Sequence, residues 1–91
     1  MATYVIAYDI PDDRRRERVA RVLLNFGRRI QKSVFTAMLD YDQHRELRRE
    51  LGSRLRQTDA LEIFPVDSRN CDRWVSWTAE PSCTKPVLVI D

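Results

Sequence analysis

The chain is poor in the side chains on which many hydrolytic and metal sites depend. It has one histidine, His44, and two cysteines, Cys71 and Cys83, with eleven residues between them. A Cys–His or Ser–His–Asp nucleophile set needs a histidine with partners, and His44 stands alone near the start of an expected helix. The cysteine spacing matches neither a zinc knuckle nor a redox C-x-x-C pair, so two reduced thiols are expected.

Long apolar runs are also missing. No stretch approaches the ~20 residues that span a bilayer. The N-terminus lacks the basic-then-apolar pattern of a secretory signal, and Asp9 interrupts the only early apolar run, so no such signal is expected. No internal repeat is visible. We therefore expect a cytoplasmic protein without membrane contact. Its 91 residues make one domain with a modest core, for which oligomerisation adds useful burial.

Charge is abundant but unevenly distributed along the chain. Between residues 14 and 29, seven arginines accompany one acidic residue, whereas the rest carries nine basic and thirteen acidic side chains. Arginine supplies fourteen of the sixteen basic residues, and a guanidinium group binds phosphate bidentately. GC-rich codon usage explains an excess of arginine but not its clustering. The cluster therefore predicts a site for a polyanion.

The stretch Thr3 to Asp9 organises the rest. Its apolar, β-branched and aromatic residues have the length of a strand, and both of its faces are apolar, so it is predicted to be central in a sheet. Asp9 places a carboxylate where this strand ends. One interpretation is a turn or cap residue, since Asp favours strand ends; the other is a metal ligand or general base.

Two amphipathic helices are expected. The first begins after Asp12 or Asp13 as its cap, and Gly27 follows it as a C-terminal cap; its apolar stripe is Val19, Val22, Leu23 and Phe26. The second begins at a capping box formed by Asp40 and Gln43. Leucines at a spacing of four then continue it to near Gln57, with Gly52 inside it: Leu47, Leu51 and Leu55.

Strand patterns occupy much of the remainder. The segment from Arg28 to Asp40 fits either two short strands joined by a tight turn or one kinked strand with a bulge. Residues 60–66 form the next strand, and Pro65 restricts its far end to an edge or a terminus. The segment from Cys71 to Trp77 fits a short helical turn or a strand. Its tryptophans are expected to serve packing or an interface rather than base stacking.

The element order predicts an α+β, ferredoxin-like βαββαβ sandwich, with two helices on one face of an antiparallel sheet. Residues 1–78 form this domain. Residues 79–91 read as a connector and a terminal apolar strand, Val87 to Ile90, that is hard to explain in a monomer. We expect this extra strand to pair with the sheet edge of a partner in a homodimer. The partner would also cover the second face of the sheet.

Several segments together resemble the small CRISPR-associated nuclease family called Cas2. They are the strand ending Tyr8-Asp9-Ile10, the Asp12-Asp13 turn, the run from Arg16 to Val19, and the run from Arg29 to Phe35 (Arg-Ile-Gln-Lys-Ser-Val-Phe). The resemblance covers nearly the whole chain, since residues 63–66 and the terminal strand also fit. A first-strand aspartate combined with the downstream R-I-Q-x-S-V-F segment is fairly specific, whereas the element order alone is weak evidence.

The resemblance implies a homodimer in which Asp9 of each protomer flanks a cleft and is a Mg²⁺ ligand of a phosphodiester-cleaving site. Other residues tied to catalysis by the resemblance are Arg16, Arg18, Arg29, Ser33 and Phe35. The resemblance also implies spacer acquisition in antiviral defence with a Cas1 integrase, a setting in which cleavage is dispensable. The arginines expected to contact nucleic acid are Arg14, Arg15, Arg16, Arg18, Arg28 and Arg29.

Three functional hypotheses follow. The first is a magnesium-dependent endonuclease that hydrolyses RNA or DNA by a metal-activated water. The second is a non-catalytic, DNA-binding scaffold that bridges Cas1 integrase subunits. The third is a regulatory module that binds a small metabolite, against which the arginine cluster argues. The residues leave open whether RNA, single-stranded DNA or duplex DNA is preferred.

Overall fold

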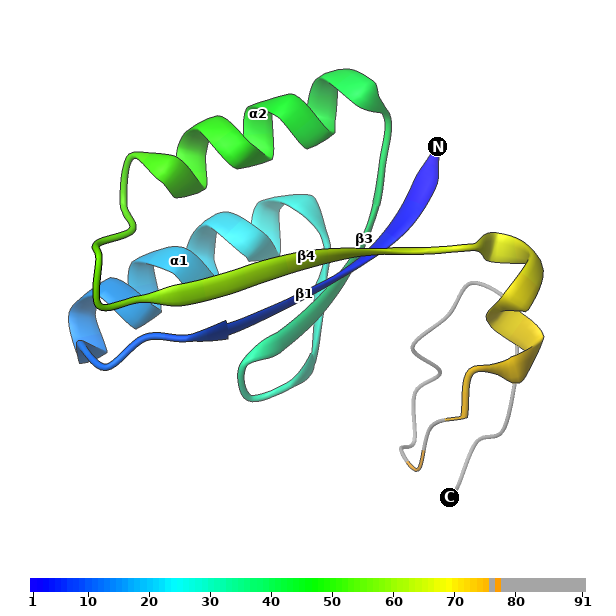
Figure 1. Cartoon of the computed structure of the whole chain (residues 1–91), viewed down its shortest axis with the longest axis horizontal. Coiled ribbons are helices and arrows are strands. Elements are labelled where there is room, and N and C mark those ends of the chain that lie inside the picture. Colours follow the sequence, from blue (N-terminus) through cyan, green and yellow to red (C-terminus); the bar gives the residue numbers. More distant parts are fainter. Residues whose placement is uncertain (76, 78–91) are drawn as a thin grey trace.

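The computed structural model describes residues 1–75 and 77 (Figure 1). Its elements follow the predicted βαββαβ order of a ferredoxin-like, α+β fold. They are β1 (Ala2–Asp9), α1 (Asp13–Phe26), β2 (Arg28–Gln31), β3 (Val34–Leu39), α2 (Tyr41–Gly52), β4 (Ala60–Val66) and a final 3-10 helix, η1 (Ser68–Arg73). Within the described ranges, neither α-helix combines the length and the apolar character needed to cross a bilayer.

The sheet confirms the predicted central position of the first strand. Its order is β2-β3-β1-β4, and β1 pairs antiparallel with β3 on one side and β4 on the other. Ile6 therefore lies between Phe35 and Ile63. Pro65 belongs to the edge strand β4, where the N–H group that proline lacks is not needed for a second ladder.

Both helices lie on the same side of the sheet (Figure 1), and they contact each other. The apolar stripes of α1 and α2 face the sheet residues Ile6, Phe35 and Leu39. The fully buried side chains are Phe35, Ile6, Ile10, Leu23, Leu39, Leu47 and Val19. Alternation places Val5 and Ala7 on the opposite, helix-free face, where both are half-buried. Cover of that face by a partner stays a prediction.

The segment after α1 forms two strands joined by a tight turn, one of the two alternatives that the sequence left open. Lys32 and Ser33 make the turn between β2 and β3. The register also shifts between Arg29 and Gln31, which marks a β-bulge. Such a bulge re-aims the side chains beside it.

The ends of α1 depend on Asp12 and Gly27. The Asp12 carboxylate accepts from the backbone N–H of Arg15 at 2.8 Å, so Asp12 is the N-cap. Gly27 follows as the C-cap in an extended conformation that any residue can adopt. Its lack of a side chain matters for packing, because a Cβ there would lie 2.1 Å from the carbonyl oxygen of Thr36 and 2.7 Å from the Cβ of Ala37.

The predicted end of the second helix was wrong. The capping box of Asp40 and Gln43 is present, but α2 ends at Gly52 and not near Gln57. The carbonyl of Leu51 accepts from the backbone N–H groups of Arg54 and Leu55, each at 3.0 Å, which closes a turn at the helix end. Glycine is a poor helix former, so the chain leaves the helix there. Leu55 still packs against the core from the turn.

The predictions for the last part of the chain have different outcomes. For the segment from Cys71 to Trp77, the helical alternative is confirmed only as far as Arg73, where η1 ends. The apolar strand at Val87 to Ile90, its exchange in a homodimer and the boundary after residue 78 lie outside the described residues.

Candidate functional site

Asp9 stands at the exit of the central strand with its side chain exposed. It pairs with Ala60 of β4, and alternation places it on the helix-free face with Ala7. A depression of about 490 Å³ opens there; we call it the carboxylate depression, and its lining includes Ala7, Asp9, Ala60 and Glu62. The carboxylate of Asp9 is therefore directed to an open surface, although it ends a strand that is otherwise covered.

Glu62 is a second carboxylate of this depression that sequence reasoning missed. It is paired with Ala7 in the register of β1 and β4, so it shares a face with Asp9. Diagonal neighbours of this kind lie about 7–8 Å apart in an antiparallel pair. The signal in the sequence was a charged residue between the apolar Leu61 and Ile63, but only the register of β1 and β4 places Glu62 beside Asp9.

The donor chemistry of the depression fits a hydrated divalent cation. Mg²⁺ is held by one or two carboxylates and completes its coordination with waters and substrate phosphates. Asp9 and Glu62 supply two such groups, whereas both oxygens of Asp59, the third carboxylate of the lining, accept from Arg15. No three Asp, Glu, His or Cys side chains converge into an ion cage anywhere in residues 1–75 and 77. The surface therefore suits an ion that is shared with a substrate better than a permanent structural ion.

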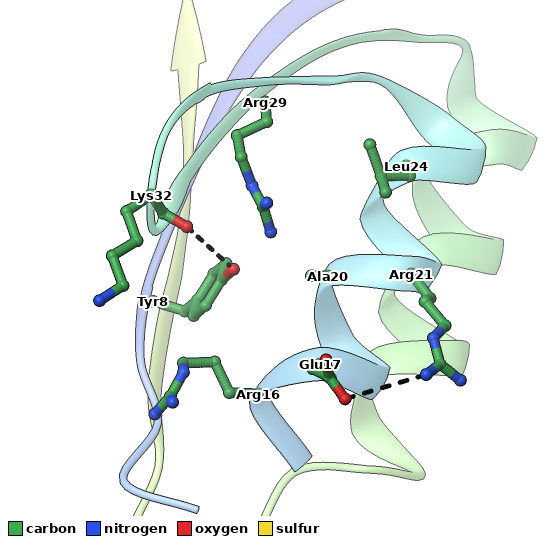
Figure 2. A pocket seen from close by; sticks show the side chains of 8 residues that line it. All are labelled: Tyr8, Arg16, Glu17, Ala20, Arg21, Leu24, Arg29 and Lys32. Atoms are coloured by element: carbon green, nitrogen blue, oxygen red, sulfur yellow. Dashed lines mark hydrogen bonds and ion pairs between the residues drawn. The ribbon is translucent and has the colours of Figure 1, made fainter. Parts of the chain in front are cut away.

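A second site lies on the other side of β1, between α1 and the β2–β3 hairpin (Figure 2). We call this cavity of about 280 Å³ the hairpin pocket, and its lining includes Tyr8, Arg16, Arg21, Arg29 and Lys32. Arg16 donates to the carbonyl oxygen of Ile10 at 2.9 Å and also pairs with Asp13. These contacts hold the Arg16 guanidinium at the end of β1, one residue beyond Asp9.

Phe35 holds Arg29 in this pocket. The two residues are direct partners in the β2–β3 register, and the guanidinium carbon of Arg29 lies 5.1 Å from the centre of the Phe35 ring, in reach of a cation–π interaction. The Tyr8 ring stacks on Phe35 at 6.2 Å. Phe35 itself is fully buried, so we infer that any contribution to catalysis is made by positioning Arg29.

Ser33 and Arg28 flank the same hairpin. The carbonyl of Ser33 accepts from the backbone N–H of Tyr8 at 3.1 Å, which ties the turn to β1 beside Asp9. Arg28 is exposed on β2, opposite Thr36. Lys32, which was not among the predicted site residues, lies in the turn, and its carbonyl accepts from the Tyr8 hydroxyl at 3.4 Å.

The remaining predicted arginines lie elsewhere. Arg14, Arg15 and Arg18 line a third cavity of about 310 Å³ between the start of α1 and the turn after α2, joined by Arg54 and Arg56. We call it the arginine pocket. Arg18 is therefore separated from Arg16, because two helical positions rotate a side chain by about 200° at 3.6 residues per turn.

Arg15, which lines this pocket, is bonded to Asp59, a residue that lines the carboxylate depression. Its Nε and Nη2 donate to the two carboxylate oxygens of Asp59, at 2.7 and 2.9 Å, and the Asp59 side chain is fully buried. The hydrogen bonds from Arg15 lower the pKa of Asp59 and raise that of Arg15. This guanidinium joins α1 to the segment before β4, so its fork is already occupied.

His44 has a packing partner. Its ring lies 4.7 Å from that of Tyr4, at an angle of 52°. Tyr4 belongs to β1 and His44 to α2, so the contact joins the helix to the sheet. His44 therefore has a packing role, and its expected absence from catalysis stays a prediction.

The site that the sequence predicted as one cluster is thus divided over three surfaces. Asp9 lies on the helix-free face, Arg16 and Arg29 lie between α1 and the hairpin, and Arg14 and Arg18 lie between the helices. Arg16 is the link between the first two, since it is held at the exit of β1.

The chain is similar to known proteins over nearly its whole length. Residues 1–74 match the family model of CRISPR associated protein Cas2. The chain is 40% identical over 87 residues to a CRISPR-associated endoribonuclease Cas2 of Synechocystis, with 94% of each protein covered. It is 47% identical over 69 residues to a CRISPR-associated endonuclease Cas2 of Thermus thermophilus, covering 69% of this chain and 71% of that protein.

A solved structure supports the fold assignment. A chain of a partial Cas6-RT-Cas1–Cas2 complex superposes with a TM-score of 0.78, at 21% identity and over 99% of both chains. The names of the curated relatives support a CRISPR-associated nuclease role. The family model covers every described helix and strand, and the chain therefore belongs to the CRISPR-associated protein Cas2 family.

Proposed function

We propose that this chain is a cytoplasmic, magnesium-dependent endonuclease that hydrolyses phosphodiester bonds in RNA or DNA during CRISPR spacer acquisition. The observation that carries the proposal is the placement of Asp9. Its carboxylate is exposed at the exit of the central strand, shares a depression with Glu62, and is followed by the carbonyl that holds Arg16. If Asp9 were only a turn residue, it would need neither a second carboxylate nor an arginine nearby.

In this proposal Asp9 and Glu62 hold Mg²⁺, which when bound supplies an activated water and neutralises charge on the phosphate. Arg16, held at the exit of β1, orients the phosphodiester group, and Arg29 offsets the developing negative charge from the other side of β1. Their fixed positions, through Ile10 and Phe35, limit the reorganisation required during the reaction. The names of the relatives, endoribonuclease and endonuclease, support phosphodiester cleavage and leave both RNA and DNA as substrates.

We further propose that the active form is a homodimer that pairs the helix-free faces. Met38 and Phe64 lie on that face and are 45% and 46% exposed, which is a large apolar area for two strands of a small domain. A partner sheet would cover them and bring the two Asp9 side chains to one interface. A symmetric pair of carboxylate depressions holds a cation better than one alone, because each contributes only two ligands.

The test is cleavage by the parent protein and by Asp9→Asn, with magnesium and with a chelator, on RNA, single-stranded DNA and duplex DNA. Asn keeps the size of Asp but removes the charge, so we expect cleavage to fall by about 100-fold or more, with thermal stability unchanged or higher. Isothermal titration with Mn²⁺ should show weaker binding in the variant. Asp42→Asn is the matched control, since the Asp42 side chain is exposed on α2. This variant should cleave like the parent.

Equal, chelator-sensitive cleavage by the parent and Asp9→Asn would remove Asp9 from the mechanism and point to a contaminating nuclease. Glu62→Gln gives a finer test, because loss of one of two ligands should weaken metal binding without affecting the fold. Unchanged Mn²⁺ binding in Glu62→Gln would exclude it as a ligand.

The alternative function is a non-catalytic DNA-binding scaffold that assembles with a Cas1 integrase. Arginines on both flanks of α1 favour it, as does the similarity to a chain from a complex whose name includes Cas1. Under this alternative, the parent would bind duplex DNA without cleaving it, and Asp9→Asn would support Cas1-dependent integration as well as the parent does.

A further inference from the structure

Asp59 carries a buried carboxylate that the proposed cleavage site does not use. Its side chain is fully buried. One oxygen accepts from Nε of Arg15 at 2.7 Å and from the backbone N–H of Arg56 at 2.9 Å. The other oxygen accepts from Nη2 of Arg15 at 2.9 Å and from the hydroxyl of Thr58 at 3.5 Å. The hydrogen bonds from Arg15 above all lower the pKa of Asp59, so this buried group is an anion at neutral pH.

Stability alone is a weak reason for such a pair. Removing two charges from water is costly, and buried ion pairs can often be replaced by apolar side chains without a loss of stability. The exposed pairs of α2, which join Arg45 to Asp42 and Arg49 to Glu46, avoid this cost. A buried bidentate pair offers geometric specificity in addition to attraction, because the guanidinium fork and the carboxylate meet in a defined orientation. The location of the pair indicates which geometry it fixes.

The pair lies where Asp9 leaves the sheet. Asp59 directly precedes Ala60, the first residue of β4, and Ala60 is the register partner of Asp9. Arg15 belongs to the first turn of α1. The pair therefore fastens this helix to the chain one residue before the position opposite Asp9. Asp59 also lines the carboxylate depression together with Asp9.

Arg16 fastens the other strand at the same place. It donates to the carbonyl oxygen of Ile10 at 2.9 Å, and Ile10 directly follows Asp9. Successive residues of an α-helix differ by about 100° in direction. Arg15 and Arg16 therefore reach from one helical turn to different strands, the first to the start of β4 and the second to the end of β1. The strand ends that carry Asp9 and Ala60 are held by the same turn of α1.

Such a fastening matters because β4 is an edge strand, whose first residues pair with a neighbour on one side only. The ends of secondary-structure elements open more readily than their centres. The spacing between Asp9 and Glu62 depends on the register at this end of β1 and β4, and Mg²⁺ demands near-ideal ligand geometry. A loose start of β4 would vary the distance between the two carboxylates and weaken cation binding.

We infer that Asp59 and Arg15 are positioning residues for the cation site, because their ion pair keeps Glu62 at the distance from Asp9 at which one divalent ion contacts both. The inference rests on the proposed function in taking Asp9 and Glu62 as the ligands. Asp59 and Arg15 contact neither the ion nor the substrate and act through the main chain of β4. Groups that orient metal ligands from outside typically contribute about 10–100-fold to metal affinity or activity.

The test combines Mn²⁺ affinity from isothermal titration with the Mg²⁺ dependence of cleavage, both in the full chain. Asp59→Asn and Arg15→Gln each break the bidentate pair. We expect each to weaken Mn²⁺ binding on the order of tenfold and to raise the Mg²⁺ concentration for half-maximal cleavage by a similar factor. The rate at saturating Mg²⁺ should stay close to that of the parent, because a bound ion itself holds the two carboxylates. Arg15→Lys keeps the charge without the fork and should be intermediate.

Hydrogen exchange gives a readout that needs neither metal nor substrate. In Asp59→Asn, the amides at the start of β4 that are protected in the parent should exchange faster, whereas protected amides near Phe64 should not change. A general loss of stability would instead accelerate exchange at both ends of the strand. The pattern along β4 therefore separates a local positioning role from a global structural one.

Two control variants isolate stability and charge. Leu39→Val removes buried apolar volume at the far end of β1, where Leu39 pairs with Ala2. It should lower the melting temperature and leave Mn²⁺ affinity unchanged. Glu46→Gln removes a carboxylate that is paired with an arginine at the surface, so it matches the change in net charge. All titrations are made well below the melting temperature of every variant, so that only folded protein is compared.

Parent-like Mn²⁺ binding in both Asp59→Asn and Arg15→Gln would overturn the inference, even with faster exchange at the start of β4. So would an equal loss of affinity in Leu39→Val or Glu46→Gln, which would attribute the effect to stability or to charge. If Asp9→Asn alone loses Mn²⁺ binding, the inference fails and the proposed function stands. Parent-like binding in Asp9→Asn would contradict the proposed function instead.

Discussion

The two flanks of α1 use arginine in opposite ways. On the hairpin flank, Arg16 is held by the carbonyl of Ile10 and Arg29 lies over the ring of Phe35. On the flank facing α2, Arg15 is bonded to Asp59, whereas the Arg18 side chain makes no hydrogen bond or ion pair within residues 1–75 and 77. The first flank holds Arg16 and Arg29 through specific contacts, whereas the second combines the fixed Arg15 with Arg18, whose side chain is not held by a hydrogen bond within residues 1–75 and 77.

This difference assigns different tasks to residues of one type. A transition state is stabilised by groups that are already in position, because reorganisation during the reaction costs energy. A phosphate backbone is held by charge that can adapt to it, because the gain comes largely from released counterions. Rigid arginines should therefore affect the cleavage rate, and adjustable arginines should affect affinity and its salt dependence.

The largest effect is expected from Arg29→Ala. Loss of a positioned guanidinium should lower the cleavage rate at saturating substrate by about 100-fold, because Phe35 keeps that group in place. Arg29→Lys should recover part of the rate, since it retains the charge but not the fork. Single-turnover cleavage measures this directly.

Arg21→Ala is the control for the hairpin pocket. Arg21 lines the same cavity but is exposed and faces Glu17. The cleavage rate of Arg21→Ala should therefore match that of the parent. If Arg29→Ala changed only the salt dependence of binding, the proposed division between the two flanks would be wrong.

The next largest effect is expected on stability, from Gly27, where the end of α1 packs against β3 of the hairpin. Gly27→Ala places a Cβ within 2.1 Å of a backbone oxygen of β3, and backbone atoms cannot move aside cheaply. Overpacking of this kind costs about 1–3 kcal/mol. Urea unfolding should show a lower midpoint for this variant.

Gly52→Ala is the opposite case at the end of α2. A Cβ there meets nothing within 4 Å, and alanine is the better helix former by about 1 kcal/mol. We expect a small gain in stability. A loss for both variants, of similar size, would mean that the contact of Gly27 with β3 is not what makes that position sensitive.

The smallest effect on stability concerns the tie between α1 and the segment before β4. Arg15 lowers the pKa of Asp59 below its ordinary value of 3.8, so the pair contributes stability above that pH, which is lost as the pH falls through the folded-state pKa. Asp59→Asn should lower the melting temperature at neutral pH. The difference from the parent should shrink below about pH 4.

Glu46→Gln is the control for this prediction. Its carboxylate is bonded to Arg49, which also lowers its pKa, but both side chains are well exposed, and such pairs contribute little. Melting temperatures of parent and Glu46→Gln should nearly coincide across the pH range. A pH-independent deficit in Asp59→Asn would indicate altered packing as the cause.

Much of the fold was predictable from local signals. The apolar run of β1, the stripe of α1, the caps at Asp12 and Asp40 and the glycine after α1 act through nearest neighbours along the chain, so they are legible in the sequence. The end of α2 was not predictable in this way. Leu55 continues the helical spacing of the leucines before it, although the helix ends at Gly52. Leu55 packs against the core from the turn after α2, so its apolar character is explained without a longer helix.

The candidate site was less predictable. The exposed carboxylate of Asp9 at the end of a buried strand could be inferred from alternation alone. Its neighbour Glu62 could not, because the pairing of Ala7 with Glu62 depends on the register between strands distant in the chain. The link from Arg15 to Asp59 spans 44 positions, and it withdraws from the predicted nucleic-acid surface a residue that looks identical to its neighbours.

By itself the sequence determined the element order, the central strand, the location of Asp9 and the concentration of arginine at the start of α1. These follow from periodicity and composition, which act locally. Only the tertiary structure decided which arginines face the hairpin, which join Arg54 and Arg56, and which carboxylate stands beside Asp9. Those choices depend on the rotation of a helix and the register of a sheet, and both are set by packing the whole core at once.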